Sequence, residues 1–390
     1  GRTRSCWVQD SISFKIEDRS GSNRSTGLLN GLRSRSQVGG RFGASSRGSW
    51  LPQPLSQKDF GYVTAVWGHS HIDNVLAWAA GLDAVGSSFK RYCMVIPSMV
   101  WDVYLDYLQR CCCEIVEVEP LEAPYEVTKG KWNRYELVLT KLRAFQLYKH
   151  GLRKVVLMDA DMLILQNIDE LFWMPAPSAS LLSGCYTGAN KQPKLSGGVL
   201  VIEPSETEFE RALDTLKSWS FNAGDKDILY FIEQDLLDMS WKSEDGRLLY
   251  HVLPFVYNVD PDMLDILPLL SPRESPTKDG TTHFPLDIGV KAVHLWNWYN
   301  PIMATSASAR QSMQINARLK HKVLWYWYEL WWDLHQEGLR RAMPDKYPIW
   351  QQECIRQHMA RFGEDQAAHF VPVLESGGQQ CAHKYGGLAW

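Results

Sequence analysis

The chain has 390 residues, of which 45% are hydrophobic, 22% charged and 12% aromatic. This composition excludes collagen-like, coiled-coil and wholly disordered chains, and it provides enough apolar side chains for a substantial core. The net charge of -3 gives no reason to expect a nucleic-acid partner.

Positive charge is concentrated at the start of the chain. Residues 1–58 contain ten Lys or Arg and three Asp or Glu, a net charge of +7, whereas the remainder carries −10. This segment is also rich in Ser and Gly, without sustained apolar periodicity. We interpret it as a disordered basic tail or as part of a processed leader. Because the chain begins with Gly, a signal or anchor segment upstream stays open.

No stretch of about 18 uninterrupted apolar residues occurs, so no transmembrane helix is predicted. The nearest candidate, at 323–334, is short, rich in Trp and broken by Glu329 and Asp333. We expect an amphipathic helix that docks its Trp side chains on the domain, with an interfacial membrane helix as the alternative. The eight cysteines include no Cys-x-x-Cys pair, and three of them are adjacent at 111–113. This pattern favours reduced, mostly buried thiols and a cytoplasmic location over a zinc ribbon or a disulfide framework.

Strand and helix signals alternate from Phe60 onward. Strands are predicted at 60–66, 91–96, 114–118, 153–158, 198–202 and 290–295, and helices at 74–85, 100–110, 135–150 (ended by Gly151 as a C-cap), 205–218, 228–239 and 304–342. This alternation predicts an α/β fold with a mainly parallel sheet flanked by helices.

Two aspartates, Asp159 and Asp161, stand directly after the apolar strand at 153–158. Ligands of open parallel sheets bind beyond the carboxyl ends of the strands. Two carboxylates one residue apart can both turn toward one cation, and such hard oxygen ligands suit Mg²⁺ or Mn²⁺, which bind phosphate oxygens. The same pattern recurs at 225–227 and 260–262 without a preceding apolar strand, and turn-capping aspartates are the alternative explanation.

Seven motifs occur in order along the chain. They are GYVT at 61–64, LTKL at 139–142, VVLMDADMLI at 155–164, NIDELF at 167–172, SGGVLV at 196–201, LPFVYN at 253–258 and VH at 293–294. Together, over roughly residues 60–302, they resemble the glycogenin-like and galactinol-synthase-like members of glycosyltransferase family 8. The resemblance implies a GT-A (Rossmann-like) domain at 59–303. The sequence pattern predicts a mostly helical extension at 304–390. It also implies a UDP-sugar donor (UDP-glucose or UDP-galactose), Mn²⁺ (or Mg²⁺), and transfer of a hexose with retention at the anomeric carbon.

The resemblance also assigns roles to residues. The implied metal ligands are Asp159, Asp161 and His294. The implied donor contacts are Tyr62, Thr64, Lys141, Asp159, Ser196, Gly197 and Gly198. The implied catalytic or sugar-positioning residues are Glu233, Gln234 and Asp235, with Asp235 foremost. Each role has an alternative. His294 could be a structural residue at a strand end, and Lys141 a solvated lysine on a helix. Residues 233–235 could be a polar first helical turn favoured by the helix dipole.

The chain departs from the family pattern at three positions. Asn297 and Asn300 stand where the family has Gly and Lys, which removes a positive charge expected beside the diphosphate. Lys291 or another cation would have to compensate. Ser196 stands where the family commonly has Asn.

The acceptor also differs from that of a glycogen primer. No Tyr occurs between Tyr257 and Tyr299, so self-glucosylation at the position that glycogenin uses is excluded. The acceptor is another molecule: a protein, a polyol or an oligosaccharide. The oligomeric state stays open, with a homodimer among the options.

The sequence therefore predicts a metal-dependent, retaining hexosyltransferase. A catalytically degenerate protein that binds nucleotide or serves as a scaffold is the alternative. A haloacid-dehalogenase-like phosphatase is disfavoured, because Met162 and Leu163 fit its pattern poorly after the aspartates.

Removal of residues 1–58 should leave the melting temperature nearly unchanged, because we expect this tail to lie outside the fold. Thermal unfolding of the truncated and full-length chains would test this. A large loss of melting temperature would show that the tail is part of the folded structure.

Overall fold

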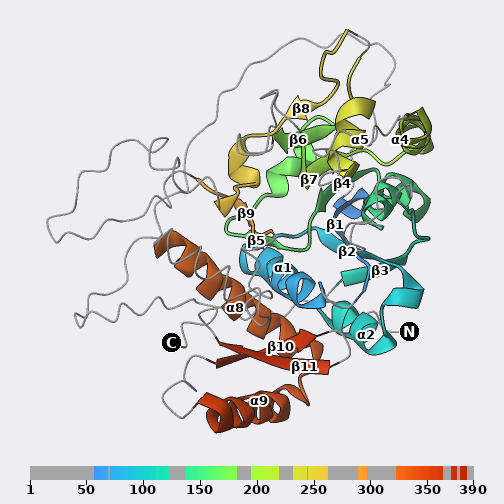
Figure 1. The fold of residues 1–390 in the computed structure, drawn as a ribbon. Coiled ribbons are helices and arrows are strands. Elements are labelled where there is room, and N and C mark those ends of the chain that lie inside the picture. The colour runs from blue at the N-terminus through green and yellow to red at the C-terminus, as the bar shows by residue number, and fades with distance from the viewer. Residues whose placement is uncertain are drawn as a thin grey trace, which may run out of the picture. The chain divides into compact units, whose positions relative to one another are not determined.

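The computed structural model describes residues 57–68, 71–111, 113–122, 137–181, 195–218, 232–243, 245–261, 289–296, 322–362, 370–375 and 378–383. They form a Rossmann-like α/β fold whose mainly parallel central sheet is flanked by helices, as the sequence predicts (Figure 1). Nearly all of the expected basic tail lies outside the described residues, and so do residues 304–321.

Seven strands form the central sheet in the order β3-β2-β1-β4-β7-β6-β8. β1, β2, β3 and β4 run parallel, and β7 runs antiparallel to both β4 and β6. β4 and β7 are buried along their whole lengths, which agrees with the apolar sequences of central strands. The strand bounds are β1 (Phe60–Val66), β2 (Lys90–Val95), β3 (Cys113–Glu117), β4 (Lys154–Met158), β6 (Ser178–Leu181), β7 (Leu195–Ile202) and β8 (His251–Val252).

Two helix ends show the local signals that the sequence contains. Gly151 ends η4 with a φ of 80°, in the left-handed region, which confirms the predicted C-cap. The Ser205 hydroxyl accepts a hydrogen bond from the Glu208 amide (3.2 Å) at the start of α4. The α-helices are α1 (Ile72–Ala84), α2 (Asp102–Arg110), α4 (Glu206–Ser218), α5 (Ile232–Ser240), α8 (Lys322–Ala342) and α9 (Tyr347–Phe362), and the 3-10 helices are η1 (Gln57–Asp59), η2 (Pro97–Met99), η4 (Val138–His150), η5 (Asp169–Trp173) and η8 (Phe255–Tyr257).

Two small sheets accompany the central one. β5 (Met162–Ile164) pairs with β9 (Ala292–His294), and β10 (Phe370–Glu375) pairs with β11 (Gly378–His383), both antiparallel. The sequence patterns predict neither β5 nor the β10–β11 hairpin. A three-residue strand is too short to show a period of two, and its pairing partner is remote in sequence.

The Trp-rich helix α8 docks on the domain as predicted. Trp327, Trp331 and Trp332 are buried in a cluster that also contains Leu163 of β5 and Val293 of β9. Among the described helices, none combines the length and apolar character needed to cross a membrane.

The cysteines follow the predicted pattern only in part. Cys93, Cys111 and Cys113 are buried and are not disulfide-bonded, and burial raises the pKa of the Cys93 thiol. Cys354 of α9 is disulfide-bonded, which corrects the expectation of reduced thiols at this position. Disulfide pairing depends on which segments the fold brings together, and cysteine spacing contains no such information.

Substitution of Gly338 in α8 by Ala should destabilise the protein by about 1–3 kcal/mol. A Cβ atom at Gly338 would lie 2.6 Å from the carbonyl oxygen of Leu76 in α1, so the two helices would have to separate. The matched control is Gly81→Ala in α1, where the nearest atoms would be 3.5 Å away. Alanine favours the helix, so this control should gain up to about 1 kcal/mol. Urea unfolding would measure the free energy of unfolding of both variants. Equal changes in the two variants would refute the close contact at Gly338.

Candidate active site

Short strands bring Asp159, Asp161 and His294 together. The Asp159 amide, just after β4, donates to the Gly198 carbonyl of β7 (3.1 Å), and the Asp161 carbonyl accepts from the Leu295 amide (3.0 Å). In the β5–β9 pair, Met162 lies opposite His294. Backbone pairing therefore places this histidine next to two aspartates that are distant in sequence.

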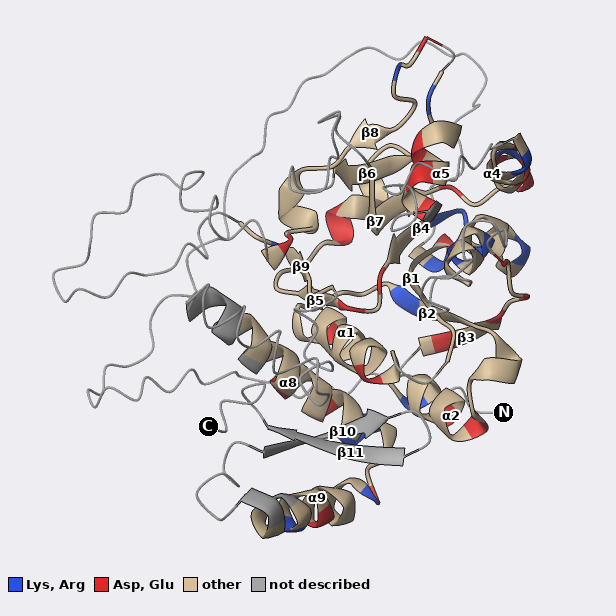
Figure 2. Ribbon diagram, in the orientation of Figure 1, with Lys and Arg blue, Asp and Glu red and all other residues tan. Residues whose placement is uncertain are grey.

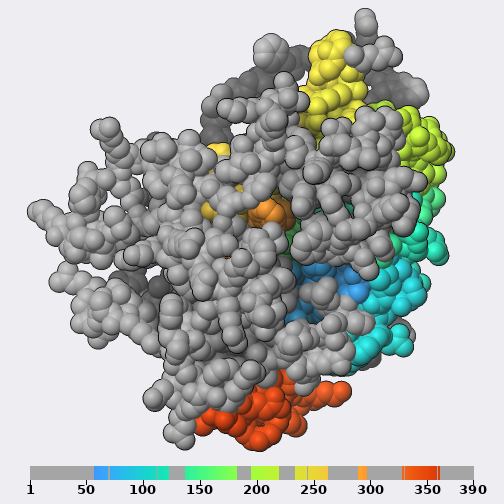
Figure 3. Space-filling view, in the orientation of Figure 1, coloured from blue at the N-terminus to red at the C-terminus, as the bar shows by residue number. Residues whose placement is uncertain are grey.

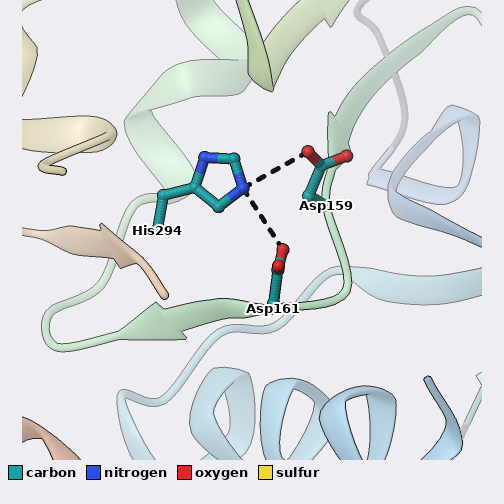
Figure 4. A group of neighbouring side chains, drawn as sticks. All are labelled: Asp159, Asp161 and His294. Carbon is teal, nitrogen blue, oxygen red and sulfur yellow. Dashed lines mark ion pairs between the residues drawn. The ribbon is translucent and has the colours of Figure 1, made fainter. Parts of the chain in front are cut away.

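The three side chains point toward one another (Figure 4). His294 Nε2 lies 3.4 Å from Asp159 Oδ2 and 3.2 Å from Asp161 Oδ1. One ligand atom from each residue can be chosen so that all three lie within 4.8 Å of one another. The side chains are 14–17% exposed, so each keeps some contact with solvent. Orange atoms of the segment that contains β9 reach the visible surface in Figure 3.

The charges in this cluster strongly affect one another. Burial opposes protonation of His294, but Asp161 and Asp159 outweigh it and raise the pKa of the imidazole to about 10. Burial likewise opposes ionisation of Asp159, but Lys141 and His294 hold the pKa of this carboxyl well below its usual range. The imidazole thus carries a proton toward two carboxylates, in a position where a bound cation would replace that proton.

The cluster fits a divalent cation. Octahedral ligands at roughly 2.1 Å from an ion lie about 3 Å from their neighbours, close to the two imidazole–carboxylate distances. Two carboxylates and one imidazole are a donor set suited to Mn²⁺, and the carboxylates also suit Mg²⁺. Side chains on this cluster could therefore hold the cation with little rearrangement.

Lys141 of η4 links the aspartates to α5. Its Nζ lies 2.5 Å from Asp159 Oδ1 and 3.4 Å from Glu233 Oε1, and its side chain is 13% exposed. Burial opposes the charge on the ammonium group, but Asp159 and Glu233 outweigh it and raise the pKa of Lys141. Figure 2 shows acidic positions on α5, which carries Glu233 and Asp235. Asp235 is half-buried, and its catalytic role stays a prediction.

Lys291 does not occupy an equivalent position. Its ammonium group pairs with Glu170, whose carboxylate also accepts a hydrogen bond from the Tyr257 hydroxyl (2.9 Å). The ammonium group of Lys291 is therefore already engaged by a carboxylate. Asn297 and Asn300 lie outside the described residues.

Ser196, Gly197 and Gly198 lie within strand β7, and the two glycines let neighbouring elements approach closely. A Cβ atom on Gly197 would lie 3.1 Å from Gln234 Cγ and 3.5 Å from Glu233 Oε1. A Cβ atom on Gly198 would lie 2.7 Å from His294 Nδ1. The absence of side chains at both glycines thus makes room for α5 and for the imidazole.

The residues of β1 are not part of this cluster. The ring of Tyr62 is fully buried against Phe172, and its hydroxyl donates to Asp169 Oδ1 (2.8 Å), so its side chain belongs to the core. Thr64 is also buried, and its Oγ1 has no hydrogen-bond partner within the described structure. A donor contact through Thr64 stays a prediction.

Asn258 adjoins the cluster but has no predicted role. It ends the motif at 253–258, and its side-chain amide donates to Ser196 Oγ (2.7 Å). The motif was the only sequence signal for this position, because a single Asn after a short turn has no distinctive pattern.

Substitution of Lys141 by Met should destabilise the metal-free protein by about 3 kcal/mol, because it leaves Asp159 and Glu233 without their shared cation. The matched control is Lys149→Met on the same helix, where the side chain is 53% exposed and 3.7 Å from Glu206. This control should change stability by less than about 0.5 kcal/mol. Urea unfolding near pH 7 would measure both, and equal losses would contradict the bridging role of Lys141.

Sequence relatives support the family resemblance inferred from the motifs, although no family model matches the chain. Galactinol synthase 1 of Solanum lycopersicum is 26% identical over 232 residues, 54% of this chain and 68% of that protein. Glycogenin-1 of Oryctolagus cuniculus is 25% identical over 296 residues, 73% of this chain and 79% of that protein. Human glycogenin-1 is 31% identical over 195 residues, 47% of this chain and half of that protein's length.

Among solved structures, the glycosyltransferase GlyE of Streptococcus pneumoniae has a TM-score of 0.44 at 16% identity, covering 72% of this chain and 63% of that chain. So loose a likeness adds nothing to the assignment, which depends on the ordered motifs and the sequence relatives. The ordered motifs and the sequence relatives together support a glycogenin-like assignment within glycosyltransferase family 8.

Proposed function

We propose that this protein is a metal-dependent, retaining hexosyltransferase that moves a hexose from a UDP-sugar to a separate acceptor. The carrying observation is the convergence of Asp159, Asp161 and His294 at the carboxyl end of β4. Buried Lys141 and the first turn of α5 lie beside them. Carboxylate, imidazole and ammonium groups of this kind suit a metal-bound diphosphate.

Each group has a role in this proposal. Asp159, Asp161 and His294 would hold Mn²⁺ (or Mg²⁺), which supplies Lewis-acid stabilisation of the negative charge on the departing UDP. Lys141 would meet phosphate or sugar oxygens. Ser196, Gly197 and Gly198 of β7 would border the sugar on one side. Glu233, Gln234 and Asp235 of α5 would position it on the other.

The reaction exchanges one bond for another at the anomeric carbon. Its bond to the β-phosphate oxygen of UDP breaks, and a bond to an acceptor hydroxyl oxygen forms on the same face as that hydroxyl loses its proton. Tyr257 is a poor acceptor, because it is 8% exposed and its hydroxyl donates to Glu170. The acceptor in this proposal is therefore a separate protein, polyol or oligosaccharide.

A non-catalytic nucleotide-binding protein is the second candidate. The pairing of Lys291 with Glu170 favours it, because Lys291 then does not replace the family lysine that is absent at Asn300. Weaker charge compensation at the diphosphate would lower donor affinity.

Substitution of Asp161 by Asn should lower Mn²⁺-dependent UDP release about 100-fold or more, because one carboxylate ligand of the cation is lost. A panel of UDP-sugars assayed with and without Mn²⁺ would measure this. The control is Asp214→Asn on α4, whose side chain is 72% exposed and pairs with Lys217. It should leave release unchanged.

Undiminished release by the Asp161 variant would refute the metal assignment. If the wild-type protein releases no UDP from any of the UDP-sugars but still binds UDP, the non-catalytic candidate is supported.

A further inference from the structure

Asn258 is a buried amide with one unsatisfied atom. Its side chain is 7% exposed, and Nδ2 donates to Ser196 Oγ at 2.7 Å. Among the residues that the structure describes, none forms a hydrogen bond with Oδ1. The bond to Ser196 orients the amide, so the oxygen is the atom that faces away from Ser196. A buried carbonyl oxygen without a partner is costly to maintain, which suggests that it is satisfied in another state of the protein.

The unsatisfied oxygen lies beside His294. A Cβ atom on Gly198 would be 2.5 Å from Asn258 Oδ1 and 2.7 Å from His294 Nδ1, so both atoms converge on the same small volume. Figure 4 shows Nδ1 on the side of the ring away from the two aspartates. Backbone bonds fix this arrangement, because the Val259 amide donates to Ala292 (3.0 Å) and the His294 amide donates to Val259 (2.9 Å).

When Nε2 of His294 binds a metal, Nδ1 of the same ring needs a hydrogen-bond acceptor. A neutral imidazole that gives its Nε2 lone pair to a cation carries its proton on Nδ1, and that N–H requires an acceptor. We propose that Asn258 is a positioning residue for His294. Its amide oxygen accepts the Nδ1–H bond and holds the imidazole in the metal-binding tautomer and orientation. This inference rests on the proposed metal site.

Substitution of Asn258 by Leu keeps much of the side-chain volume but removes the acceptor. The Mn²⁺ affinity of the full chain should fall about 10- to 100-fold, measured by the electron paramagnetic resonance signal of free Mn²⁺. Ser196→Ala keeps the amide oxygen but removes its anchor, so it should cause a smaller loss. Melting temperatures of the metal-free variants would show whether each one folds.

A double-mutant cycle separates positioning from a general structural effect. With His294→Ala in place, Asn258→Leu should change Mn²⁺ affinity less than about twofold, because Asn258 acts through the imidazole. A tenfold loss in that background, or unchanged affinity of the single variant, would overturn the proposal. If Asn258→Leu does not fold, Ser196→Ala enters the same cycle with the same criteria.

Asp161→Asn distinguishes the failure of this inference from failure of the metal site. If that variant binds Mn²⁺ as well as wild type, the proposed metal site is wrong, and the inference fails with it. If it loses binding while Asn258→Leu retains full affinity, the metal site stands and only the positioning role is wrong.

Discussion

Three carboxylates converge at the end of β4, and the fold has to hold them together despite their mutual repulsion. Lys141 contacts Asp159 and Glu233, and His294 contacts Asp159 and Asp161. Each cation thus bridges two acids, and Asp159 belongs to both bridges. The side chains of Lys141, His294 and the two aspartates are 13–17% exposed, so solvent screens their charges only partly. The two bridges therefore offset the repulsion among the three carboxylates.

That balance depends on packing far from the site in sequence. His294 reaches the aspartates through the β5–β9 pairing, in which Leu163 lies opposite Val293. Both side chains are buried in the cluster that contains Trp331 and Trp332 of α8. α8 thus packs against the strand pair through this cluster. The apolar contacts of α8 and the polar contacts of the cluster stabilise the same two short strands.

The sequence allowed the prediction of features with local signals. The apolar run of β4, the cap at Gly151 and the paired aspartates all depend on neighbouring residues, and the structure has them. The strand at 290–295 was predicted, but His294 was identified as a ligand only through the family resemblance, because a sequence pattern does not show that this strand pairs with the remote β5.

Other features had no local signal at all. The burial of Tyr62 against η5, the pairing of Lys291 with Glu170 and the disulfide of Cys354 follow from contacts between distant segments. The motif that contains Asn258 was visible in the sequence, but the free amide oxygen beside His294 was not. Residue types can be read from a sequence, whereas the partner of each polar atom depends on the fold.

The arrangement also connects metal binding to the donor through Lys141. In the structure this ammonium group is occupied by Asp159 and Glu233. In the proposed function, a divalent cation would neutralise Asp159 and weaken its hold on Lys141, so the ammonium group could turn to donor oxygens. This release matters more here than in a protein with the family lysine, since Asn300 supplies no charge. Donor affinity should then depend on the metal in two ways. The metal would bind the diphosphate directly, and it would also release the Lys141 ammonium group to bind donor oxygens.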